Sequence, residues 1–259
     1  MIEEPYRWVE AIANRREYID TQLASGSPIV VLSCDEGVLF LTFGRSRQKI
    51  FEIYDRIAMG AIGHPGDIER LRMAAIELAS AEGFTRSAAD VSLRRLVHYS
   101  LSPTMKTAFE QIYGPPFLAR LVFAEVGATP EEDLFLTVDY DGAIATNGAG
   151  PSQKRRDFVV LGGTKESGEL MESFLEKEHR PAANRDDAIN TAMDAWSVGQ
   201  MTALENRAKE LPDREAIAKH REERLSHAAV EAAILERSGK SAIRYRAVAK
   251  DELRSLVKT

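Results

Sequence analysis

The chain has 259 residues, of which 44% are hydrophobic, so it can bury one sizeable core. Its formal net charge of −6 argues against a protein whose main task is to neutralise nucleic-acid phosphate or to coat an anionic membrane, because both tasks need clustered Lys and Arg. The single cysteine, Cys34, permits no internal disulfide and no cysteine-based zinc site, which fits a reducing cytoplasm.

The N-terminal thirty residues carry charges throughout and lack the apolar core of a secretory signal. No apolar run approaches membrane-spanning length. We therefore expect a soluble cytoplasmic protein without a nucleic-acid or membrane partner, and the sequence suggests neither a metal nor a cofactor.

The first half of the chain predicts one helix, two hairpins and two further helices. Apolar residues near helical spacing predict an amphipathic helix over 6–25, which Gly26 ends. Short β-branched or apolar runs then pair as two hairpins, 28–33 with 38–43 and 49–54 with 56–62. Helices follow at 67–82 and 93–109, and Pro103 should bend or end the second one locally.

The second half returns to strands, at 117–125, 134–139, 143–146 and 158–162. Two helices, 167–178 and 185–203, come next, and a last hairpin from 228–235 and 241–248 precedes a short helix over 251–257. The densely charged segment at about 205–224 indicates a solvated helix or a mobile connection.

Strands, two helices, strands, two helices and strands therefore follow one another along the chain. Segregated runs of this kind predict an α+β fold, a four-layer αββα sandwich of two antiparallel sheets flanked by helix pairs. We expect one sandwich domain over 27–259, with the charged insertion at about 205–224, and a separate N-terminal segment over 1–26.

The stretch KIFEIYDRIAMGAIG at 49–63 and the helix after it resemble the second hairpin and first core helix of a 20S proteasome α-subunit. Further matching blocks lie at 16–18 with Gly26, 37–40, 69–72, 75–79, 116–117, 123–126, 140–142 and 158–164. Together these blocks span residues 15 to about 180, so the chain resembles a bacterial proteasome α-subunit, the noncatalytic member of the N-terminal nucleophile hydrolase fold family.

The resemblance implies that this chain has no catalytic residues. Catalytic members of the family use an N-terminal threonine whose amine acts as base, together with a lysine and an aspartate. Here Gly26 and Ser27 stand at the nucleophile junction and Phe43 stands at the aspartate position, so only Lys49 remains. The chain would be a structural and gating subunit of a threonine-type protease complex.

In α-subunits the same lysine position has another task. The resemblance implies that Lys49 lies in a pocket between neighbouring subunits and binds the C-terminal carboxylate of an activator, with Gly26, Gly63 and His64 lining the pocket. From the residue patterns alone, Lys49 is an exposed strand lysine, Gly26 a helix stop and His64 a solvated turn residue.

The N-terminal segment is the second functional element that the resemblance implies. The gate and ring-contact candidates are Met1, Ile2, Pro5, Tyr6, Glu17 and Tyr18. The simpler alternative is an amphipathic helix that completes the core of its own monomer.

The implied partners are those of a proteasome core particle. The resemblance implies a homo-oligomeric ring of seven copies, catalytic β-subunits against the helices at 68–109, a ring-shaped ATPase activator on the opposite surface, and unfolded protein substrates. Two alternatives stay open: an autoprocessed hydrolase of the same fold that cleaves before Ser27 and uses it as nucleophile, and a stand-alone scaffold protein.

Overall fold

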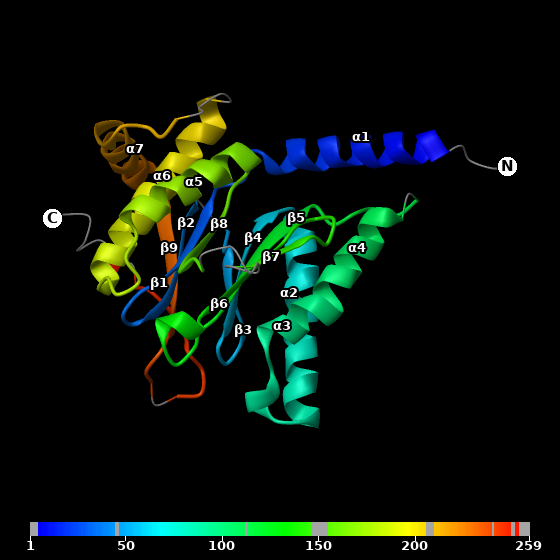
Figure 1. Cartoon of the computed structure of the whole chain (residues 1–259), viewed down its shortest axis with the longest axis horizontal. Helices are drawn as coiled ribbons and strands as arrows, with labels where there is room; N and C mark the ends of the chain where they lie inside the picture. The colour runs from blue at the N-terminus through cyan, green and yellow to red at the C-terminus, as the bar shows by residue number, and fades with distance from the viewer. Residues whose placement is uncertain are drawn as a thin grey trace.

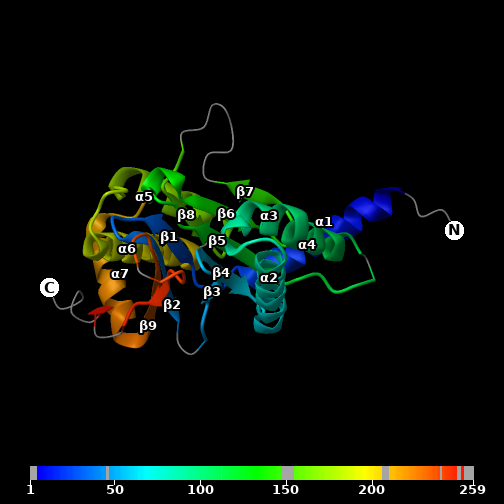
Figure 2. The same ribbon diagram turned by 90° about the horizontal axis from the view of Figure 1, so that it is seen from below.

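The computed structural model describes residues 5–44, 47–111, 113–146, 155–205, 210–239, 241–249 and 252–253. Within this part, two five-stranded antiparallel sheets face each other, and helices cover both outer faces (Figure 1). The view from below separates the same layers, with α2 and α4 on one side of the strands and α6 and α7 on the other (Figure 2). The predicted αββα sandwich is confirmed.

The first sheet has the strand order β10-β9-β2-β1-β8. Its strands are β1 (Ile29–Ser33), β2 (Gly37–Gly44), β8 (Phe158–Leu161), β9 (Ala229–Glu236) and β10 (Tyr245–Ala247). The second sheet has the order β3-β4-β5-β6-β7. It consists of β3 (Ile50–Tyr54), β4 (Ile57–Gly63), β5 (Ala119–Glu125), β6 (Leu134–Val138) and β7 (Ile144–Thr146).

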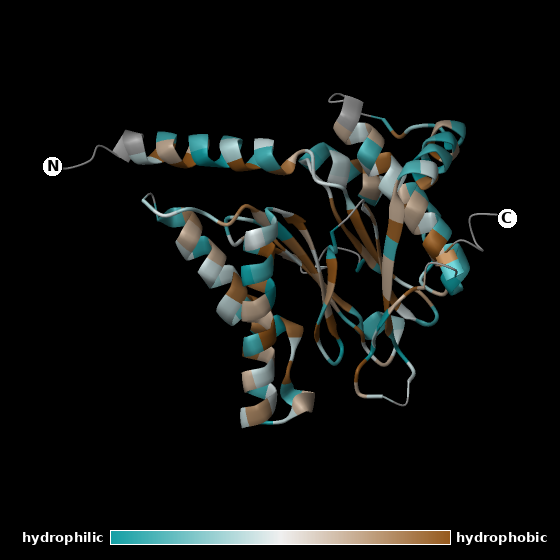
Figure 3. Cartoon of the chain, turned by 180° about the vertical axis from the view of Figure 1, so that it is seen from behind, coloured by the Kyte–Doolittle hydropathy of each residue, from teal (hydrophilic) through white to brown (hydrophobic). Residues whose placement is uncertain are grey.

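Both faces of the central strands are buried, and side chains alternate between two cores. In β1, Ile29 and Val31 point toward the second sheet, whereas Val30 and Leu32 pack with the helices on the outer face. All five residues of β1 are buried. This double burial explains why the strands read as continuous apolar runs and appear brown in the centre of the molecule (Figure 3).

The helices of each outer face form their own core with the sheet beneath them. On the first sheet lie α5 (Lys165–Glu178) and α6 (Arg185–Glu205), and α7 (Arg214–His227) packs on α6. On the second sheet lie α2 (Pro65–Thr85), α3 (Leu93–Leu96) and α4 (Ser102–Glu110). Short 3-10 turns occupy Ala88–Asp90 and Pro130–Glu132.

The expected irregularity near Pro103 is present. Val97–Leu101 forms a π-helical turn between α3 and α4, and Pro103 lies in the first turn of α4. A proline lacks the amide that a regular α-helical turn would use, so the first turn of a helix is a position that tolerates it.

The N-terminal helix α1 (Pro5–Leu23) projects beyond the sandwich (Figure 1). Its C-terminal end joins a core, where Ile19 and Leu23 pack with Phe109 and Tyr140, and Ile12 packs against the edge of this cluster. Arg15 adds hydrogen bonds from its guanidinium to backbone carbonyls of the 109–114 segment. Near the N-terminus of α1, Trp8 is 45% exposed, so the monomer itself does not bury this part of the helix.

The expected bounds of the last hairpin differ from the structure, the charged segment takes the helical one of its two expected forms, and the C-terminal helix is described only in part. The last hairpin pairs only through Tyr245–Ala247 on its second strand, not over 241–248. The charged segment at about 205–224 becomes helix α7 from Arg214 onward. Of the expected helix over 251–257, only 252–253 belong to the described residues, and both are helical. No helix in the described ranges has the length and apolar character needed to cross a bilayer.

Candidate functional site

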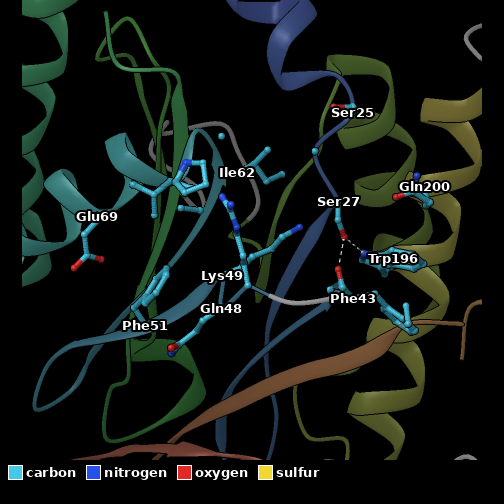
Figure 4. A pocket seen from close by; sticks show the side chains of 18 of the residues that line it. Ser25, Ser27, Phe43, Gln48, Lys49, Phe51, Ile62, Glu69, Trp196 and Gln200 are labelled. Atoms are coloured by element: carbon cyan, nitrogen blue, oxygen red, sulfur yellow. Dashed lines mark hydrogen bonds between the residues drawn. The ribbon is translucent and has the colours of Figure 1, made fainter.

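A cavity of about 610 Å³ opens where both sheets end near the base of α1. Its walls come from the segment before β1, the connection from β2 to β3, the end of β4, and α6 (Figure 4). Gly26, Lys49 and Gly63, three of the predicted docking residues, line this cavity together.

Lys49 extends into the cavity between Ile62 and Ser27 (Figure 4). Burial lowers the pKa of Lys49, and the nearby Glu231 carboxylate opposes that shift. Within the described part of the chain the ammonium group makes neither a hydrogen bond nor an ion pair. A desolvated ammonium group in this position is suited to bind a carboxylate.

The backbone beside Lys49 is fixed by Glu231 from β9. The amide of Lys49 donates to both carboxylate oxygens of Glu231, at 2.9 and 3.1 Å, and the amide of Ile50 donates at 2.9 Å. Burial raises the pKa of Glu231, and these amides oppose the shift. The carboxylate therefore holds the start of β3 and leaves the Lys49 side chain directed into the cavity.

The lining residues Gly26 and Gly63 each lie closer to a neighbouring segment of the chain than a residue with a side chain could. A Cβ on Gly26 would lie 2.1 Å from Cγ2 of Ile62. Gly63 has a φ of +143°, and a Cβ there would lie 2.0 Å from the carbonyl oxygen of Leu118. Glycine at these two positions thus shapes the cavity wall beside Lys49.

His64, the fourth predicted pocket residue, is not part of the lining. It is the N-cap of α2, where its ring Nδ1 accepts the Gly66 amide at 3.3 Å. Its own amide donates to the Leu118 carbonyl at 2.7 Å, and its side chain is exposed. Its geometry is that of a helix cap.

Ser27 lies on the opposite wall (Figure 4), and its hydroxyl already has hydrogen-bond partners, among them Thr42 at 3.4 Å. Its Oγ donates to the Phe43 carbonyl at 2.7 Å and accepts the indole N–H of Trp196 at 3.1 Å. Phe43 is 2% exposed and stacks on Trp196, with ring centroids 4.1 Å apart. The position expected for a catalytic aspartate is therefore occupied by a buried aromatic pair.

Sequence reasoning missed the wall that the C-terminal half of the chain contributes. Trp196 and Gln200 from α6, and Arg224 from α7, line the same cavity. Trp196 fitted the apolar stripe of a helix, and Arg224 belonged to a segment interpreted as solvated. No local signal connects these residues with Lys49, because only the packing of α6 and α7 on the first sheet brings them together.

The N-terminal gate and ring-contact candidates lie in three places. Met1 and Ile2 lie outside the described residues, and Pro5 and Tyr6 belong to the first turn of α1. Glu17 and Tyr18 are exposed, and Tyr18 keeps 55% of its surface in solvent. Only the C-terminal end of α1 thus fits the alternative of a helix that completes its own monomer.

A second, larger cavity of about 710 Å³ lies at the opposite end of β1, beside Phe158. Arginines line it, but Arg156 is paired with Glu172 at 2.6 Å and with Glu176 at 2.8 Å. No group of three or more His, Cys, Asp or Glu residues in the described ranges is arranged to hold a metal ion. The Lys49 cavity is therefore the better candidate site.

Comparison of the sequence with known proteins finds one family model and several similar proteins. The family model described as "Proteasome subunit" matches residues 24–203. The protein named proteasome subunit alpha of Frankia casuarinae is 32% identical over 192 residues, covering 73% of this chain and 75% of that protein. The proteins of the same name from Streptomyces scabiei, 32% identical over 190 residues (73% and 72%), and Frankia alni, 31% over 191 residues (73% and 74%), are similar to the same extent.

Proposed function

Because this chain belongs to the proteasome subunit family, we propose that it is a noncatalytic α-subunit that forms the outer ring of a cytoplasmic core particle, gates substrate entry and docks a ring-shaped ATPase. The observation that carries the docking role is the Lys49 ammonium group, which is partly buried and lies inside a cavity lined by Gly26 and Gly63. A C-terminal carboxylate of the activator fits this environment, since it would supply the missing charge partner.

The same cavity argues against a hydrolase that uses Ser27. A serine nucleophile needs a neighbouring base that takes its proton. The Ser27 hydroxyl instead donates to the Phe43 carbonyl, and an aromatic ring stands where the family's catalytic members have a carboxylate. Without these partners, Lys49 can bind an anion but cannot support amide hydrolysis.

Helix α1 supports a ring contact. Its N-terminal half extends beyond the sandwich, and Trp8 and Val9 there are 45% and 66% exposed. An apolar face that the monomer leaves uncovered is expected to pack on a partner. We assign that partner to the neighbouring copy in a ring of seven, and we assign the exposed apolar residues Met73, Leu78 and Phe84 of α2 to contact with β-subunits.

The docking role is tested by Lys49→Ala in particles reconstituted with β-subunits and the ATPase. Hydrolysis of small peptides should stay near the unmodified level, while ATP-driven degradation of a folded protein should fall. Lys165→Ala is the matched control, because that side chain is 84% exposed on α5 and does not belong to the cavity lining. Unchanged protein degradation by Lys49→Ala would remove the docking assignment.

Native mass spectrometry tests the noncatalytic assembly. An intact chain in a ring near seven copies, or co-purification with a β-subunit that begins with threonine, is the expected result. Loss of the first 26 residues would indicate autoprocessing before Ser27. An intact monomer that never associates with β-subunits would indicate a stand-alone scaffold.

A further inference from the structure

The lining of the Lys49 cavity has an excess of positive charge. Arg47, Lys49 and Arg224 line it, and among the described residues Glu69 is the one acidic side chain in the lining. Glu69 is already paired, because the Arg72 guanidinium donates to its carboxylate at 2.8 and 2.6 Å. The carboxylate in the wall therefore does little to offset the three cations.

The cations themselves have no acidic partner within ion-pair distance in the described ranges. Arg224 donates from Nε to Nε2 of His220 at 3.3 Å. Burial lowers the pKa of His220, so the imidazole is neutral at neutral pH and does not compensate the guanidinium charge. Arg47 is exposed, whereas Arg224 is half-buried, so the cavity presents the Lys49 ammonium group and the Arg224 guanidinium group on different walls.

The structure holds Arg224 at this wall through helix α7. Asp213 caps the helix by accepting the Ala216 amide at 2.7 Å, and Ile217 is buried against α6. Arg221 of α7 bridges to Asp194 of α6 at 3.0 Å. Because these contacts join α7 to α6, Arg224 is held in place relative to the α6 wall of the cavity.

An aromatic contact links the same helix to the cavity wall. His220 stacks on Trp196 with ring centroids 5.9 Å apart, and Trp196 in turn donates to Ser27. Helix α7 begins at Arg214, beyond the family-model match that ends at residue 203. The second cation is thus supplied by a part of this chain that the family match does not cover.

We infer that this cavity binds a peptide C-terminus that carries a second acidic group next to its terminal carboxylate, with Lys49 binding the terminal carboxylate and Arg224 binding the acidic side chain. The inference rests on the proposed docking function. A planar guanidinium matches a carboxylate through two parallel hydrogen bonds, which favours Arg224 as the residue that selects the acidic side chain. The volume of about 610 Å³ is within the range of cavities that hold small ligands.

The test uses fluorescence anisotropy with the chain assembled on β-subunits and three labelled alanine hexapeptides. One has Glu at the penultimate position and a free carboxylate, the second has Gln there, and the third is the Glu peptide with an amidated C-terminus. The Glu peptide should bind about fivefold more tightly than the Gln peptide, as expected for one partly exposed ion pair. Equal binding of these two peptides would overturn the inference.

Variants of α7 identify the residue responsible. Arg224→Gln should abolish the preference for Glu over Gln, and Arg224→Lys should retain part of it. Arg214→Gln is the matched control, because Arg214 is on the same helix, is 83% exposed and pairs with Glu178 outside the cavity lining. A preference that persists in Arg224→Gln would also overturn the inference.

The amidated peptide separates this inference from the function on which it rests. If the amidated and free peptides bind equally well, and Lys49→Ala changes neither, carboxylate docking itself is wrong. If Lys49→Ala weakens all free-carboxylate peptides while Arg224→Gln leaves the Glu preference intact, docking stands and only the role of Arg224 is wrong.

Discussion

A buried ion pair joins the two sheets at the end of β1 that lies farthest from the Lys49 cavity. The Asp133 side chain is fully buried and the Arg237 side chain is 10% exposed, and the guanidinium donates to both carboxylate oxygens at 2.7 and 2.9 Å. Asp133 also accepts from Ser33 Oγ at 2.6 Å and from the Gly127 amide at 2.9 Å. One carboxylate thereby connects β1 and the end of β9 to the start of β6.

We predict that Arg237→Met lowers the free energy of unfolding by about 3–5 kcal/mol, the usual cost of removing one partner from a buried ion pair. Methionine preserves much of the aliphatic volume, so the loss arises mainly from a buried carboxylate that has lost its guanidinium partner, while Ser33 and the Gly127 amide still donate to it. With a urea m-value of about 3 kcal/mol/M, the midpoint of unfolding should fall by about 1–1.7 M.

The assay is urea unfolding followed by circular dichroism and tryptophan fluorescence at one fixed protein concentration, because assembly makes stability concentration-dependent. The m-value should stay the same while the midpoint shifts. A second variant, Asp133→Asn with Arg237→Met, removes the charge. The amide oxygen of Asn can still accept the Gly127 amide, and its NH2 group can donate to the Ser33 hydroxyl oxygen. It should be about 2 kcal/mol more stable than Arg237→Met alone.

The double variant decides whether charge is the cause. If it is no more stable than Arg237→Met, lost packing explains the effect and the electrostatic reasoning is refuted. A loss below about 1 kcal/mol in Arg237→Met would refute the assigned magnitude as well, since that value is typical of exposed pairs.

Three further changes test other parts of the structure. Gly63→Ala should lower the free energy of unfolding by at least about 1–3 kcal/mol in thermal unfolding experiments, because the backbone has a φ of +143° and the new methyl group would meet the Leu118 carbonyl. In the control Gly168→Ala, the new methyl group meets nothing within 4 Å, so this variant should stabilise α5 by about 0.5–1 kcal/mol. Burial lowers the pKa of His179 from 6.5 to about 4. Between these two pH values the unfolded chain binds a proton that the folded chain does not, so the free energy of unfolding should fall by up to about 3 kcal/mol as the pH decreases from 6.5 to about 4. Urea unfolding at pH 7 and pH 4.5 should show that the free energy of unfolding depends less on pH in His179→Phe than in the unmodified chain. An equal pH dependence in the two proteins would count against this role of His179. Trp8→Asp should reduce the ring population in native mass spectra and leave the thermal midpoint of the dissociated monomer unchanged, and an unchanged ring would contradict a ring contact through α1.

The sequence predicted most secondary-structure elements to within about two or three residues, because their signals are local. The hairpin at 28–33 and 38–43 appears as Ile29–Ser33 and Gly37–Gly44, since apolar runs surround a turn. Helix α2 begins earlier than the expected residue 67, because Pro65 fits its first turn and His64 caps it.

The boundaries that failed depend on tertiary pairing. In the last hairpin, only Tyr245–Ala247 forms a strand on β9, with one flanking backbone hydrogen bond on each side, although the expected strand was longer. In the same way, Lys49, Gly26 and Gly63 could be placed in one pocket because they belong to blocks that resemble a known family. The far wall could not be predicted, since Trp196 and Arg224 reach the cavity only through helix packing.

Aromatic packing explains how this site can keep the lysine and still favour binding over hydrolysis. Phe43 stacks on Trp196, and Trp196 contacts both Ser27 and His220, so a continuous row of side chains runs from the end of β2 to α7. A carboxylate at position 43 would have given Lys49 a fixed counter-charge and raised its pKa. With an aromatic ring there instead, the ammonium group stays desolvated and lacks an intramolecular ion pair in the described ranges, which favours equilibrium binding of an external carboxylate. The row ends at Arg224, which places a second cation on the same cavity without restoring a base that could activate Ser27.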